Sequence, residues 1–132
     1  MAQNIGHVTI VVKDYDEAIE YYTRVLGFNL LEDTDMGNGK RWVLVAPAGT
    51  KGTSILLAKA ATEEQRNHIG NQTGGRVFMF LFTDDFKGDY IKMKEKGVKF
   101  VEEPRSEEYA DVVIFEDIYG NRWDFLQPRK QK

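Results

Sequence analysis

The sequence contains no cysteine and only two histidines, His7 and His68, among its 132 residues. The lack of cysteine excludes disulfides, thiol nucleophiles and thiolate metal sites, so a metal ion would need His, Asp, Glu or amide ligands. The sequence also lacks an apolar run long enough to span a membrane, and it lacks the basic, apolar and small-residue order of a signal peptide. We therefore expect a cytoplasmic protein with no membrane partner.

A surplus of positive charge is also missing, because the formal net charge at pH 7 is −3. Proteins that bind nucleic acid generally displace phosphate counterions with a basic surface. The lysines of residues 92–99 are interleaved with acidic residues, which is typical of a solvated helix face. We therefore expect no nucleic-acid partner.

The first half of the chain shows a strand, a helix and further strands. Residues 7–12 are β-rich, and Asp14 after them can accept hydrogen bonds from the free N–H groups of a helix start. Apolar residues then recur at helical spacing until Gly27, which can adopt the left-handed conformation that ends a helix. Three more β-rich segments follow, at residues 28–31, 41–46 and 53–58.

The second half repeats this pattern. Residues 76–82 predict a strand, Asp84 and Asp85 can open a helix, and Gly97 can close it. The helix starts Asp14 and Asp84 are separated by 84 − 14 = 70 residues, and the helix ends Gly27 and Gly97 by 97 − 27 = 70 residues. Further β-rich segments lie at residues 98–101, 111–116 and 121–126.

The repeat predicts an α+β fold made of two tandem βαβββ modules, whose curved mixed sheets together form a cleft. We assign residues 1–60 to the N-terminal module, 61–75 to a polar linker and 76–128 to the C-terminal module. A helical turn is expected inside the linker, at residues 63–68.

Both ends of the sequence resemble a known family. Residues 7–28, HVTIVVKDYDEAIEYYTRVLGF, are similar to the opening strand and helix of vicinal oxygen chelate proteins, the superfamily of glyoxalases, bleomycin-resistance proteins and extradiol dioxygenases. Residues 115–128, FEDIYGNRWDFLQP, are similar to the closing turn and strand of the same proteins. The resemblance covers roughly residues 5–128 and implies the glyoxalase fold, a small-molecule ligand and a homodimer.

The resemblance also implies where a metal would bind. Metal-using members hold a divalent ion with one ligand from the first and last strand of each module, and His7 and Asp124 occupy two of these positions here. The repeat places Leu56 and Val77 at the other two, and neither side chain can coordinate a metal. We expect no firmly held metal, although a divalent metal remains possible if His7 and Asp124 recruit a further donor such as Glu116 or His68.

Strand alternation from His7 predicts which side chains line the cleft. On the opposite, helix-facing side of the C-terminal sheet we expect core residues at Phe78, Phe80, Phe82 and Trp123. The predicted ligand-binding residues are His7, Thr9, Trp42, Leu56, Val77, Met79 and Arg122, with His7 and Asp124 as catalytic candidates.

Three functions fit these residues. The first is a protein that binds a small organic ligand in an apolar cleft without a metal. The second is a metal-dependent lyase, isomerase or dioxygenase of the glyoxalase type. The third is a metal-free acid–base enzyme that uses His7 and Asp124. The sequence leaves open the identity of the ligand and whether the cleft lies within one chain or between two.

Overall fold

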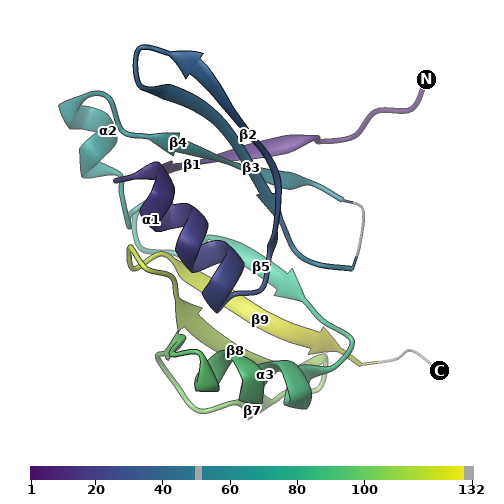
Figure 1. Ribbon diagram of the computed structural model, residues 1–132. Coiled ribbons are helices and arrows are strands. Elements are labelled where there is room, and N and C mark those ends of the chain that lie inside the picture. Colours follow the sequence, from purple (N-terminus) through teal and green to yellow (C-terminus); the bar gives the residue numbers. More distant parts are fainter. Residues whose placement is uncertain (50–51, 130–132) are drawn as a thin grey trace. The chain divides into compact units, whose positions relative to one another are not determined.

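The computed structural model describes residues 1–49 and 52–129 and confirms an α+β fold of two βαβββ-type modules (Figure 1). The chain divides into two compact units, Met1–Ile69 and Gly70–Lys132. This division falls inside the segment that the sequence suggests as the linker. Within the described ranges, no helix has the length and apolar character needed to cross a membrane.

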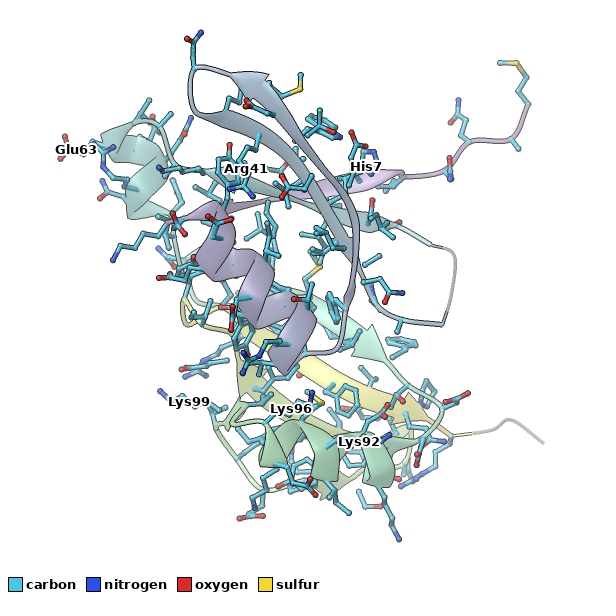
Figure 2. All side chains as sticks on the ribbon, viewed as in Figure 1. His7, Arg41, Glu63, Lys92, Lys96 and Lys99 are labelled. Atoms are coloured by element: carbon cyan, nitrogen blue, oxygen red, sulfur yellow. The ribbon has the colours of Figure 1, made fainter. Side chains whose placement is uncertain are left out.

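The N-terminal unit is a four-stranded sheet in the order β1-β4-β3-β2 with one long helical segment against it. Strand β1 runs parallel to β4, and the remaining neighbours are antiparallel. The elements are β1 (His7–Val12), α1 (Tyr15–Glu20), the π-helical turn η1 (Tyr21–Val25), β2 (Asn29–Gly37), β3 (Lys40–Ala46), β4 (Ser54–Lys59) and α2 (Glu63–Asn67). The expected helical turn in the linker is confirmed by α2, whose first residue Glu63 is labelled in Figure 2.

The long helical segment begins and ends as its residues predict. The Asp14 side chain accepts a hydrogen bond from Glu17 N at 2.9 Å and caps the first turn. Gly27 at φ 76° follows the last turn in the left-handed region. Between these ends, α1 changes into η1, and a π-helical turn is the form that one extra residue takes within an α-helix.

The C-terminal unit repeats the same sheet order as β5-β9-β8-β6, with β7 paired to β8. Its first and last strands, β5 and β9, are again parallel neighbours. The elements are β5 (Met79–Phe82), α3 (Phe86–Glu95), β6 (Lys99–Phe100), β7 (Arg105–Ser106), β8 (Ala110–Glu116) and β9 (Arg122–Pro128).

The strand registers show that the offset between equivalent positions of the two units is one residue larger than predicted for the strands. Thr9 lies opposite Leu56 in the N-terminal unit, and Phe80 lies opposite Asp124 in the C-terminal unit. Since Leu56 and Asp124 are equivalent, Phe80 corresponds to Thr9, and the offset is 80 − 9 = 71 rather than 70. The helix cap follows the same offset, because the N-cap of α3 is Asp85 and not Asp84.

The π-helical turn explains why the glycines still differ by 70. From Asp14 to Gly27 there are 27 − 14 = 13 steps, whereas from Asp85 to Gly97 there are 97 − 85 = 12. The first helix therefore contains one more residue than the second, and η1 accommodates it.

A register change of one residue exchanges the two faces of a strand. The prediction that Phe80 and Phe82 are helix-side core is wrong, because they are 61% and 64% exposed. The residue opposite Trp123 is Met79, which therefore lies on the helix side of the sheet. The predicted place of Trp123 in the core is confirmed by its exposure of 2%. Phe78, at 78 − 7 = 71, takes the position equivalent to His7 that the sequence assigned to Val77.

Candidate functional site

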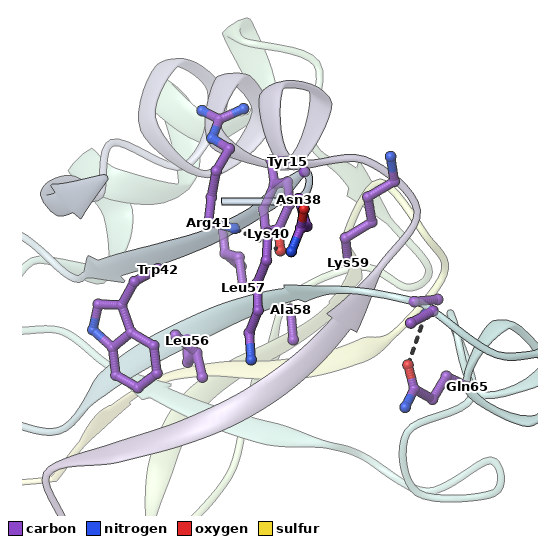
Figure 3. A pocket seen from close by; sticks show the side chains of 13 residues that line it. Tyr15, Asn38, Lys40, Arg41, Trp42, Leu56, Leu57, Ala58, Lys59 and Gln65 are labelled. Carbon is purple, nitrogen blue, oxygen red and sulfur yellow. Dashed lines mark hydrogen bonds between the residues drawn. The ribbon is translucent and has the colours of Figure 1, made fainter. Parts of the chain in front are cut away.

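The N-terminal unit contains a cavity of about 560 Å³ between β3 and β4. These strands pair only at Leu44 with Leu56 and at Val45 with Ile55, so the sheet is not closed beyond them. The cavity lies at this unpaired end, and its volume is in the range typical of small-molecule sites. Its apolar lining includes Tyr15, Trp42, Leu56, Leu57, Ala58 and Ala60 (Figure 3).

The face of the sheet away from α1, which we call the open face, holds the ligand-binding residues predicted in this unit. Thr9 is opposite Leu56, which is opposite Leu44, so these three side chains share one face. By alternation His7 and Trp42 are on it as well, and their rings meet edge to face with centroids 6.2 Å apart. The fold therefore brings His7, Thr9, Trp42 and Leu56 together.

A short hydrogen bond fixes the His7 ring. His7 Nδ1 is 2.6 Å from Ser54 Oγ, and the Ser54 hydroxyl donates to the Gly6 carbonyl oxygen at 3.3 Å. A hydroxyl can donate or accept, so this contact fixes the orientation of the imidazole, and the second ring nitrogen, Nε2, supplies a further polar group on the open face.

Arg41 anchors the helix to the wall of the cavity. Its guanidinium contacts Asp33 Oδ2 at 2.7 Å and Asp16 Oδ1 at 2.9 Å and lies over the Tyr15 ring, 5.2 Å from its centroid. The hydrogen bonds from Arg41 lower the pKa of the Asp33 carboxyl below its ordinary value. These contacts join α1 to β2 and β3, so the Arg41 charge is balanced on the helix side. Figure 2 labels Arg41 on β3 and His7 on β1.

The C-terminal unit carries Asp124 on the corresponding face of its own sheet, between Phe80 of β5 and Ile114 of β8. Its Oδ1 is buried and has no hydrogen-bond partner among the described residues. Burial raises the pKa of the Asp124 carboxyl, and Glu102 acts in the same direction while Arg105 opposes both. Asp124 is therefore a poorly compensated carboxylate at neutral pH.

Three other predicted residues of this unit are placed as follows. Arg122 is exposed and lies 3.7 Å from Glu116, Nε to Oε2. Val77 precedes β5, and Met79 is half-buried on the Trp123 side of the sheet. Contact of Val77, Met79 and Arg122 with a ligand stays a prediction.

The residues at the family's metal positions do not suit a metal ion. With the corrected register these positions hold His7, Leu56, Phe78 and Asp124, and two of the four are hydrocarbon side chains. Within residues 1–49 and 52–129, no group of three or more His, Asp or Glu side chains is arranged to bind a metal. Of the possible extra donors, Glu116 pairs with Lys99 at 3.1 Å and His68 is exposed after α2.

The sequence from residue 4 to residue 125 matches the profile of the Glyoxalase/Bleomycin resistance protein/Dioxygenase superfamily. The chain belongs to this superfamily. It is 54% identical over 128 residues to an uncharacterized protein of Shewanella frigidimarina (strain NCIMB 400), a match that covers 96% of this chain and 95% of the relative.

Two solved structures are also similar to this chain over nearly all of both chains. The structure of UcmS2 has a TM-score of 0.82 at 28% identity and covers 96% of this chain and 98% of its own. The structure of TnmS3, described as an antibiotic binding protein from Streptomyces sp. CB03234, has a TM-score of 0.76 at 27% identity and covers 97% and 98%. One protein with a similar structure is therefore described as antibiotic-binding.

Some features of the site were not predicted from the sequence. The Arg41 contacts join residues from three elements that lie 8 to 25 positions apart in the chain, and no local pattern signals them. Lys40 lies on the open face by alternation from Trp42. The sequence names Trp42 as a candidate without fixing the register of its strand, so it could not place Lys40.

Proposed function

We propose that this protein binds a small organic molecule in the N-terminal cavity and does so without a metal ion. The observation that carries the proposal is the cavity itself, where Trp42 and Leu56 meet a mainly apolar wall and a few polar groups stand at its margin. His7 lies outside the cavity lining, and its ring contacts the Trp42 ring edge to face. The antibiotic-binding description of TnmS3 supports the same type of ligand.

The other two functions have less support. A glyoxalase-type reaction needs a bound metal to polarise a carbonyl, and the residues at the metal positions supply too few donors. An acid–base reaction by His7 and Asp124 stays a prediction that no described contact supports. Homodimer formation stays a prediction, which analytical ultracentrifugation tests.

Trp42 provides the first test of binding. We expect the full-length protein to bind 2-naphthamide, a neutral aromatic probe, in isothermal titration calorimetry. Trp42→Ala should weaken binding by about tenfold or more, because a central aromatic anchor commonly dominates a site. Trp42→Phe should retain most of the affinity.

Tyr109→Ala serves as the matched control, because Tyr109 is an aromatic residue of the C-terminal unit with 59% exposure. Urea unfolding of each variant separates loss of binding from loss of fold. Equal affinity of the wild type and Trp42→Ala, with both folded, contradicts binding in this cavity.

A second test concerns the metal. Protein purified without chelator should contain far less than one equivalent of metal, and Mn²⁺, Fe²⁺, Ni²⁺ or Zn²⁺ should shift its thermal midpoint no more than they shift that of His7→Ala. Stoichiometric metal, or a shift that His7→Ala abolishes, contradicts the metal-free proposal.

A further inference from the structure

Two neighbouring basic residues of β3, Lys40 and Arg41, lie on opposite faces of the sheet. Arg41 faces the helix side, where Asp16 and Asp33 balance its charge. Lys40, one residue earlier, lies by alternation on the open face with Trp42. Figure 3 shows the two side chains extending in opposite directions, with the Lys40 amine reaching the region of Leu56 and Ala58.

The Lys40 ammonium has no acidic partner. Among the described residues it makes no ion pair and no hydrogen bond, whereas Arg41 has both. Glu32 also lies on the open face, but it is opposite Leu44 and accepts a hydrogen bond from Thr34 Oγ1, while Lys40 pairs with Gly37 at the far end of the hairpin. An unpaired cation at the edge of an apolar cavity favours an anionic partner, and because Lys40 is exposed its charge contributes modestly.

We propose that the ligands of this cavity are organic anions, with an aromatic or apolar body against Trp42 and Leu56 and a carboxylate or similar group at Lys40. This inference rests on the proposed function, which it narrows to a ligand class. Lys40 and Trp42 are two positions apart on one strand, so their Cα atoms lie roughly 7 Å apart along β3. One small molecule with a charged group and a ring can span this distance.

Lys59 offers a control within the same cavity wall. It shares the cavity lining with Lys40 but lies at the end of β4, where alternation from Leu57 places it on the helix side. Figure 3 shows its amine directed away from that of Lys40. Lys40→Gln and Lys59→Gln therefore change the net charge equally and differ only in the face they affect.

The test compares 2-naphthoate with 2-naphthamide, which share one ring system and differ in charge. We expect the wild type to bind the naphthoate about fivefold more tightly in calorimetry at low salt, in keeping with one partly exposed charge-assisted contact. Lys40→Gln should remove this preference, so that the variant binds both probes with the same affinity. Lys40→Arg and Lys59→Gln should keep it, and added salt should reduce it.

The outcomes separate the two proposals. Equal affinity of the wild type for both probes overturns the anion inference and leaves small-molecule binding intact. A preference that survives Lys40→Gln, or that Lys59→Gln removes equally, overturns the role of Lys40. If neither probe binds to the folded wild-type protein, the proposed function and this inference both fail.

Discussion

The last hairpin differs between the two units. In the C-terminal unit β8 and β9 pair continuously from Ala110 with Pro128 to Glu116 with Arg122. In the N-terminal unit the equivalent strands pair only at Leu44 with Leu56 and at Val45 with Ile55. The same strand order therefore yields a closed hairpin in one unit and a cavity in the other. The two units therefore differ in how far their last hairpin pairs and not in their strand order.

Asp117 stabilises the closed hairpin, and its removal should have the largest effect. The buried carboxylate accepts hydrogen bonds from Tyr119 N, Asn121 N and Nδ2, and Trp123 Nε1. Asp117→Ala leaves these donors without their acceptor, so we expect a loss of about 3 kcal/mol in the free energy of unfolding. Urea unfolding measures it, and Asp117→Asn should lose less. A loss below about 1 kcal/mol contradicts this role.

Arg41 stabilises the N-terminal unit as Asp117 stabilises the C-terminal unit. Its removal should lower the free energy of unfolding by less. Arg41→Ala removes the contacts to Asp16, Asp33 and the Tyr15 ring, and we expect it to lower the free energy of unfolding by about 1–2 kcal/mol.

Asp33→Asn tests the charge alone. Because the pKa of Asp33 is lowered in the folded protein, its contribution is present above the unfolded pKa and is lost as pH falls through the folded pKa. The stability difference from wild type should therefore disappear at low pH. A difference that persists there means that the effect is not one of charge.

Replacing Asp124 should change the stability in the opposite direction from replacing Asp33, and this change should be the smallest. A raised pKa means that the folded state binds the proton more tightly, so the favourable contribution is present below the unfolded pKa and is lost as pH rises through the folded pKa. Asp124→Asn should consequently stabilise the protein by roughly 0.5 kcal/mol at pH 7 and have little effect near pH 3. Thermal unfolding across this range checks the sign, and destabilisation at pH 7 would show that the ionised carboxylate has a favourable partner.

The sequence predicted the order of the main strands and the cap of the first helix, because alternation and capping are local signals, whereas the short strand β7 and the second cap, Asp85, differ from the prediction. β1 was predicted at His7–Val12, where the structure has it, and Asp14 caps α1. The error at Phe80 and Phe82 came from applying the offset of 70 between the helix-ending glycines to the strand before the helix, where the extra residue of the first helix makes the offset 71. The sequence pattern could not predict the cavity, because the cavity depends on where β3 and β4 stop pairing.

The π-helical turn Tyr21–Val25 has a consequence for exchanging parts between the halves of the chain. A graft of residues 77–97 onto positions 7–27 matches in length but places Val77 at His7 and inverts every side chain of the first strand. A graft of residues 78–97 keeps the faces and shortens the helix by one residue, which removes the need for the wider turn. The π-helical turn thus accommodates the one residue by which the first helix is longer than the second. Equivalent side chains of the first strands can then lie on the same face of each sheet.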